Sequence, residues 1–275
     1  MKKFTTLVAI DFSKSSYAVL AKALNFTQKM GGELHVVHII ENSFFSKKID
    51  LDSIKDTTFK KLVKKFSTIK YENYHCISGK VKVQVANTAR ILNADVIIMG
   101  NSGETHFLSE LLMGSHTKEI IKYAQTPVLV IKIDHEIEYQ NILVLTDLSQ
   151  ESADAIKKIA KIFPNSNIKL VNLYYLPLDN RINIYGFGEK EIKEYLESVE
   201  KESEKNIDEF LKSLALSMQI SITASAINSS LNPKQFKEEV AEINYDLLAI
   251  HATQNVSFFA FDILENSVVD VFVLK

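Results

Sequence analysis

Glycines and small polar residues cluster in one segment of the first half, with a spacing that could bind phosphate. The segment runs from Gly100 through Gly103 to Gly114 and Ser115. Glycine permits positive φ and lets a ligand approach backbone amides closely. A helix that starts at Ser115 would also present free N–H groups and the positive end of its dipole to an anion. The pattern therefore indicates a phosphate-binding loop; glycines that serve only as turn residues remain the alternative, since short glycine patterns also occur by chance.

A carboxylate at Asp11 is the second group that could do chemistry. It follows the short β-rich run 6–10 and could accept hydrogen bonds from a ribose hydroxyl or an adenine amine. Open α/β sheets bind their ligands beyond the carboxyl ends of the strands, where the strand order reverses. If the strands that end at Asp11 and Gly100 flank that point, the two segments face each other across one crevice. Together they predict a nucleotide site with apolar walls, a carboxylate for the sugar and amides for the phosphates.

Strands and amphipathic helices alternate along the chain, which is the arrangement needed to hold such a crevice. In the first half, apolar runs and helical spacing predict strands at 6–10, 34–40, 74–78, 96–99 and 128–131, with helices after Ser13 and at 51–66, 81–92 and 115–123. The second half repeats this order, with strands at 142–145, 168–174, 220–227, 247–250 and 271–275. Near-continuous apolar strands between amphipathic helices indicate a parallel sheet that is covered on both faces.

The two halves are copies of one unit. At an offset of 136 residues, Asp11 aligns with Asp147 and Ser13 with Ser149. A unit of this length fits the usual size of one domain. We therefore predict an α/β protein of two tandem units, each an open five-stranded parallel sheet with helices on both faces, with domains at 1–136 and 137–275.

The first half resembles the universal stress protein family. Nucleotide-binding members carry a Gly-x2-Gly-x9-Gly-Ser/Thr signature after the fourth strand, an aspartate that ends the first strand and an adenine-facing apolar residue late in the second. The matching positions here are Asp11, Ile39, Gly100, Gly103, Gly114 and Ser115, with ten residues between the second and third glycines. The resemblance implies that domain 1–136 binds ATP, with or without Mg²⁺, and that the amide of His116 lies near the phosphates with Gly103, Gly114 and Ser115.

The second half lacks this motif. His251 stands where Gly100 stands, and no glycine follows Gly188. The stretch 252–267 replaces the loop and much of the fourth helix, without a clear helix start. We expect this degenerate copy to lack a phosphate site, since Asp147 alone is insufficient, and to pack against the first copy as an internal pseudo-dimer. A homodimer of whole chains stays open.

Composition limits the other classes of function. A content of 46% hydrophobic and 24% charged residues is typical of a globular protein. A net charge of −2 gives no electrostatic attraction to nucleic acid. The longest apolar runs are far shorter than the roughly 20 residues of a bilayer span, so no membrane is expected. The start lacks the long apolar core of a signal peptide, and Cys76, the only cysteine, agrees with a reducing compartment. We expect a cytoplasmic protein.

Three functions follow from these residues. The first is a universal stress protein that binds ATP through its first domain and acts as a stress-linked regulator or adaptor for an unknown protein partner. The second is a scaffold without nucleotide that binds a protein partner or a small apolar ligand. The third is slow ATP hydrolysis, for which His106, His116 and His251 are the only candidate bases near the crevice. Since no dedicated base or metal cluster is evident, we expect a regulator and not a dedicated catalyst.

Overall fold

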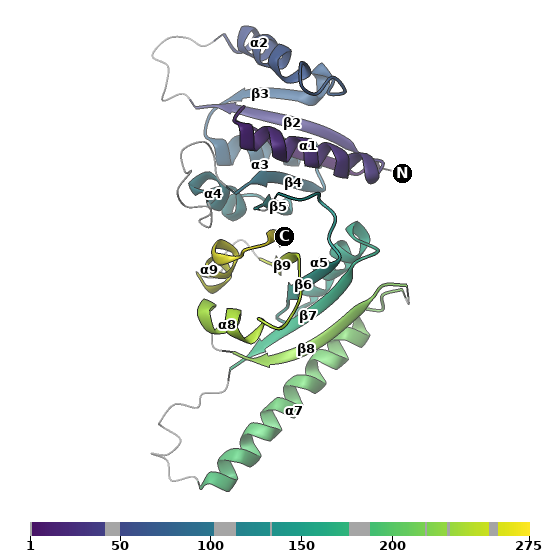
Figure 1. Cartoon of the computed structure of the whole chain (residues 1–275), viewed down its shortest axis with the longest axis vertical. Coiled ribbons are helices and arrows are strands. Elements are labelled where there is room, and N and C mark those ends of the chain that lie inside the picture. Colours follow the sequence, from purple (N-terminus) through teal and green to yellow (C-terminus); the bar gives the residue numbers. More distant parts are fainter. Residues whose placement is uncertain are drawn as a thin grey trace. The chain divides into compact units, whose positions relative to one another are not determined.

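The chain folds into α/β structure with mostly parallel sheets, as the alternation of strands and helices predicts. The computed structural model describes residues 2–41, 50–101, 114–132, 134–175, 188–217, 219–229, 232–252 and 258–275, with the backbone alone at 258 and 259. Two compact units divide the chain (Figure 1). Unit 1 comprises Met1–Glu138, Ala252–Val256 and Glu265–Lys275, and unit 2 comprises Tyr139–His251 and Ser257–Leu264.

Unit 1 is built on a sheet in the order β3-β2-β1-β4-β5-β10. Its strands are β1 (Thr5–Ala9), β2 (Glu33–Ile40), β3 (Tyr74–Ser78), β4 (Val96–Gly100), β5 (Val128–Ile131) and β10 (Asp270–Leu274). The first five are parallel, which confirms the predicted five-stranded parallel sheet. Strand β10, from the end of the chain, adds to this sheet antiparallel to β5, a pairing that the sequence analysis did not predict.

The α-helices that the structure describes in unit 1 cover its sheet. They are α1 (Lys14–Lys29), α2 (Leu51–Val63), α3 (Val81–Ile91) and α4 (Ser115–Tyr123), with a short 3-10 helix, η2 (Tyr71–Asn73), before β3. The chain moves from β1 to β3 in one direction and then returns to β4 and β5 on the other side of β1. Because such crossovers are right-handed, α1 and α2 cover one face, and α3 and α4, which contact each other, cover the opposite face.

Unit 2 repeats this arrangement with four parallel strands in the order β9-β6-β7-β8. Its strands are β6 (Asn141–Leu145), β7 (Asn167–Tyr174), β8 (Ile222–Asn228) and β9 (Leu247–His251). The helices that follow β6, β7, β8 and β9 are α5 (Gln150–Ile162), α7 (Glu189–Ser213), α8 (Pro233–Glu239) and α9 (Phe258–Asn266). The long α7 packs along β8.

Helix α9 lies in a segment that was not expected to form a full helix. The segment 252–267 was expected to lose much of the fourth helix, yet nine residues of it are helical. Its inward side chains are buried, with Ile263 4% and Leu264 0% exposed. Tertiary burial of an apolar face can stabilise a helix that has no strong cap of its own, and that term is invisible to a search for start signals.

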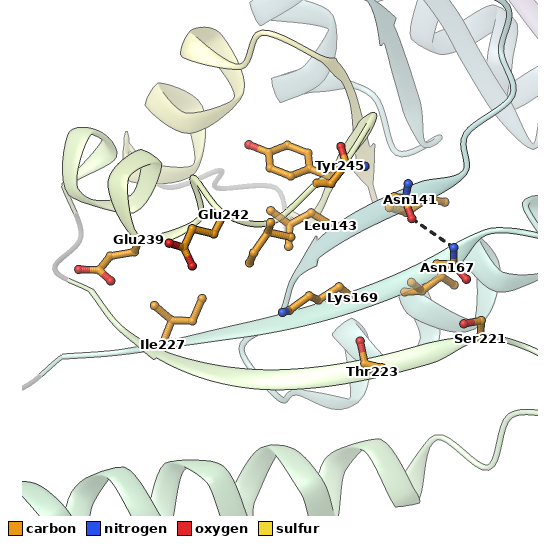
Figure 2. A pocket seen from close by; sticks show the side chains of 14 residues that line it. Asn141, Leu143, Asn167, Lys169, Ser221, Thr223, Ile227, Glu239, Glu242 and Tyr245 are labelled. Carbon is orange, nitrogen blue, oxygen red and sulfur yellow. Dashed lines mark hydrogen bonds between the residues drawn. The ribbon is translucent and has the colours of Figure 1, made fainter.

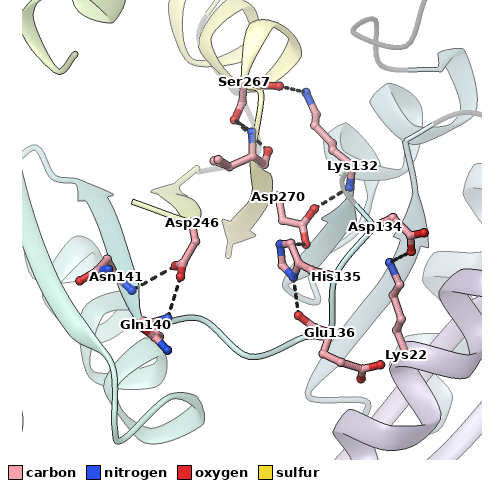
Figure 3. A network of polar contacts seen from close by, with 11 residues as sticks. Lys22, Lys132, Asp134, His135, Glu136, Gln140, Asn141, Asp246, Ser267 and Asp270 are labelled. Carbon is pink, nitrogen blue, oxygen red and sulfur yellow. Dashed lines mark hydrogen bonds and ion pairs between the residues drawn. The ribbon is translucent and has the colours of Figure 1, made fainter. Parts of the chain in front are cut away.

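Strand β10 is fastened to unit 1 by a buried polar network (Figure 3). The carboxylate of Asp270, which has no exposed surface, accepts a 2.6 Å hydrogen bond from the backbone N–H of Lys132. The Lys132 ammonium donates to the carbonyls of Glu265 at 2.9 Å and Ser267 at 3.0 Å, at the C-terminal end of α9. Burial lowers the pKa of Lys132 to about 8, against the opposing attraction of Glu265 and Asp270.

Candidate functional site

The predicted crevice coincides with the point where the strand order of unit 1 reverses. Strand β1 lies between β2 and β4, with all three carboxyl ends at one edge. In this register Asp11, which follows β1, comes level with Ile39 near the end of β2 and just beyond Gly100 at the end of β4. Ligands of open α/β sheets bind at this kind of edge. The fold therefore brings the three residues to the edge where a ligand is expected.

The turn after β1 fixes the carboxylate of Asp11. Phe12 adopts φ of 66°, a left-handed conformation that is uncommon for an aromatic residue. Its ring packs edge-on against His38 of β2, with centroids 4.7 Å apart, which helps to hold this conformation. The turn lets the amide N–H of Ser13 donate to Asp11 Oδ1 at 3.0 Å, while Ser13 itself begins α1.

The electrostatics of this turn keep Asp11 ionised. Burial acts to raise the pKa of its carboxyl, but hydrogen bonding from Ser13 and, less strongly, from Ser16 offsets burial, so the pKa is lowered. The hydrogen bond from the Ser13 amide uses Oδ1 of this carboxylate. The exposed carboxylate therefore keeps accepting capacity for a ligand.

Helix α4 starts beside the end of β4. Gly114 is its N-cap residue, with φ of −60° and ψ of 153°, and its own N–H donates to the Asn101 carbonyl at 2.7 Å. The hydroxyl of Thr117, which is 3% exposed, donates to the carbonyl of Gly100 at 3.2 Å. These contacts fasten the first turn of α4 to the carboxyl end of β4, so the helix N-terminus is aimed at the same edge as Asp11.

Among the described residues, none accepts a hydrogen bond from the first three N–H groups of α4. Helices α1, α2, α5 and α8 begin at residues whose side chains accept a hydrogen bond from the first turn: Ser13, Asp50, Ser149 and Asn232. Gly114 has no side chain to do so. In the described part of the chain, the N–H groups of Ser115, His116 and Thr117 have no hydrogen-bond acceptor. Unsatisfied N–H groups at a helix N-terminus favour an anion, through both hydrogen bonding and the helix dipole.

The predicted site residues fall into two groups. Asp11, Ile39, Gly100, Gly114, Ser115 and His116 belong to elements that meet at one edge of unit 1. Gly103 and His106 lie outside the described residues. The sequence analysis missed Thr117 and Asn101, which fasten α4 to β4. In the sequence, only Thr117 itself could have suggested this contact, because a hydroxyl in the first turn of a helix often bonds to nearby backbone.

The corresponding turn of unit 2 uses its carboxylate internally. Leu148 repeats the left-handed conformation of Phe12, with φ of 63°. Asp147 Oδ1 accepts from the Ser149 amide at 3.0 Å, the Ser149 hydroxyl at 2.6 Å and the Ser152 hydroxyl at 2.5 Å. Burial acts to raise the pKa of Asp147, but these serines offset it and lower the pKa. The serines thus occupy one oxygen of this carboxylate.

Two further features bear on the class of site. Across the described ranges, no three His, Cys, Asp or Glu side chains come together as a metal-binding group. None of the helices that the structure describes combines the length and apolarity needed to cross a bilayer.

The order of the strands makes this a doubly wound α/β protein. The N-terminus of α4 lies where the strand order reverses, which is the usual place of a ligand site in such folds. The profile described as "Universal stress protein family" matches residues 4–132. Universal stress protein A homolog 1 of Coxiella burnetii is 35% identical over 136 residues, which cover 46% of this chain and 93% of that protein. The chain belongs to the universal stress protein family.

Solved structures show the same fold over the full length. A functionally unknown protein from Pseudomonas aeruginosa superposes on this chain with a TM-score of 0.66 at 12% identity. The match covers 99% of this chain and 92% of the Pseudomonas protein. A universal stress protein from Archaeoglobus fulgidus gives a TM-score of 0.62 at 17% identity, with coverage of 100% and 97%. At these identities the likeness concerns the fold, and it extends over both halves of the chain.

Proposed function

We propose that unit 1 binds ATP at the carboxyl edge of β1 and β4. The observation that carries this proposal is the set of three acceptor-free amides, those of Ser115, His116 and Thr117, at an edge that also holds Asp11. A phosphate group supplies the acceptors and the negative charge that this helix start lacks. Asp11 supplies an acceptor for the neutral donors of a nucleoside.

Each residue then has a role that its position supports. The carboxylate of Asp11 accepts from a ribose hydroxyl or the adenine amine, and the half-buried side chain of Ile39 contacts the base. The first-turn amides of α4 donate to the phosphates, and Gly114 keeps their approach open. Gly100 and Gly103 are assigned to the phosphate-binding segment, as the family signature implies. ATP would bind with or without Mg²⁺, which would act as the counter-ion of its phosphates.

We propose that the second domain, residues 137–275, does not bind nucleotide. Its carboxylate, Asp147, already accepts three hydrogen bonds through Oδ1 from its own serines. Strand β9 ends at His251, with no glycine at or after it. The expected stoichiometry is therefore one nucleotide per chain, bound by the domain at residues 1–136.

The proposed role is that of a cytoplasmic regulator in the stress response. ATP that contacts both Asp11 and the start of α4 would favour one arrangement of this edge of unit 1. A ligand shifts an equilibrium only by its difference in affinity for the two states, so a protein partner must distinguish the bound from the free arrangement. No catalytic residue is proposed.

Isothermal titration of the intact chain with ATP tests this proposal. We expect a saturable heat with one site per chain and competition by AMP for the same site. Heats that do not saturate at millimolar ATP, or a stoichiometry of two, would contradict it.

A further inference from the structure

A hollow lies in unit 2, at the amino ends of its strands. It has a volume of about 660 Å³ and lies over the first residues of β6, β7 and β8 (Figure 2). That volume is within the range of about 300–1,000 Å³ that is typical of small-molecule sites. The side chains of Lys169 and Thr223, which are paired in register on adjacent strands, lie on its floor.

The hollow exists because α8 is short. In unit 1, the helix between the third and fourth strands, α3, has 11 residues, whereas its counterpart α8 has 7. After α8 the chain turns, and it enters β9 through Asp246, which accepts from the backbone N–H groups of Gln140 at 2.8 Å and Asn141 at 3.0 Å (Figure 3). The end of α8 at Glu239 and the residues that follow, up to Tyr245, therefore form a wall beside the sheet, where a longer helix would cover it.

Charges of opposite sign line this hollow without neutralising each other. Lys169 projects from the sheet, and Glu239 and Glu242 belong to the segment that forms the wall. Throughout the described residues, none of these three side chains takes part in an ion pair or a hydrogen bond. The hollow also has apolar surface, from the half-buried side chains of Ile227 on β8 and Tyr245 on the wall.

We propose that this hollow is a binding site for a small zwitterion, an amino acid or a dipeptide with an apolar side chain. Lys169 would pair with the ligand carboxylate and Glu242 with its ammonium group. Ile227 and Tyr245 would contact its apolar side chain. A ligand with only one of these charges would leave the opposite partner unpaired and would desolvate it on binding, which is why both charges are needed. The proposal is independent of nucleotide binding by unit 1.

The test is an NMR titration of the intact ¹⁵N-labelled chain with L-leucyl-L-leucine as the probe. We expect saturable shifts of the amides of Lys169, Thr223 and Glu242, with a Kd of about 1 mM or tighter. Capping the probe as its N-acetyl or C-amide derivative removes one charge, and each capped form should bind about tenfold more weakly, the loss of one good contact.

Substitutions in the hollow and away from it complete the test. Lys169→Gln and Glu242→Gln should each weaken the dipeptide about tenfold, while Lys157→Gln, an exposed lysine of α5, should leave its affinity unchanged. ATP titrations should be the same in all three variants. Shifts that do not saturate, equal binding of capped and uncapped probes, or equal affinities of Lys169→Gln and Lys157→Gln would overturn the proposal.

Discussion

The hydroxyl of Ser152 donates a 2.5 Å hydrogen bond to the carboxylate of Asp147. In unit 1, the corresponding hydroxyl, that of Ser16, donates to the backbone carbonyl of Ser13 at 3.1 Å and interacts only weakly with Asp11. One pair of turns with the same sequence pattern thus has two different hydrogen-bond arrangements. The carboxylate of Asp147 accepts two serine hydroxyls in addition to the Ser149 amide, so it stabilises its own turn more strongly than Asp11 does.

Asparagine at these two positions should therefore act on different properties. Asp11→Asn is expected to weaken ATP binding by about 1.5–3 kcal/mol, which is roughly ten- to hundredfold in Kd, because a charged acceptor is replaced by a neutral amide with one acceptor oxygen fewer. Asp147→Asn should leave ATP affinity unchanged but lower the free energy of unfolding by about 1 kcal/mol. Calorimetric titration and urea denaturation of both variants measure the two effects. Equal loss of ATP affinity in both would refute the assignment of the site to unit 1.

The N-cap glycine of α4 allows a substitution whose effects on stability and binding have opposite signs. Its φ of −60° is accessible to any residue, so Gly114→Asp causes no backbone strain. The new carboxylate would cap the first turn and raise the free energy of unfolding by a few tenths of a kcal/mol. The same carboxylate would occupy the amides and repel phosphate, so ATP affinity should fall by about 1.4 kcal/mol or more, at least tenfold.

Gly188, the N-cap of α7 in unit 2, provides the matched control. Gly188→Asp places the same charge at another glycine-capped helix and should leave the Kd for ATP unchanged. The measurements are thermal unfolding and ATP titration of both variants. An unchanged Kd in Gly114→Asp would show that the first turn of α4 does not bind the phosphates.

Lys132 should give the stability of the chain a distinct pH dependence. Its pKa is lowered by burial from 10.5 to about 8 in the folded state, so between these values the unfolded chain binds more protons. Stability therefore rises with pH across this window, since folding no longer requires burial of a charge. Lys132→Met removes this proton linkage. We therefore compare the free energies of unfolding of the native chain and of Lys132→Met. The native value minus the variant value should increase from pH 8 to pH 10.5. A difference that stays constant would mean that Lys132 is not held in the buried network.

Much of the fold could be predicted from local sequence. The parallel strands and the start of α4 at Ser115 follow from apolar runs, periodicity and capping residues. The antiparallel pairing of β10 with β5 could not be predicted, because the choice of a strand partner far along the chain leaves no local pattern. The left-handed Phe12 and Leu148 were also unpredictable, since neither is a residue type that favours positive φ.

The candidate site was predictable in its residue types but not in its hydrogen bonding. Glycine spacing and Asp11 located the edge, since both lie at strand ends. The distinction between Asp11 and Asp147 depends on which way two serine hydroxyls point, and the sequence around them is nearly the same in both halves. The hollow at Lys169 was missed because it arises from a helix that ends early and not from any motif.

The central claim is that the acceptor-free amides of α4 bind the phosphates of ATP. The most direct measurement is a ¹H–¹⁵N NMR spectrum of the intact chain with and without ATP. The claim predicts that the amide signals of Ser115, His116 and Thr117 shift strongly downfield and saturate at one ATP per chain, while those of Ser149 and Ser152 stay in place. Unmoved signals from these three amides in the presence of saturating ATP would contradict it.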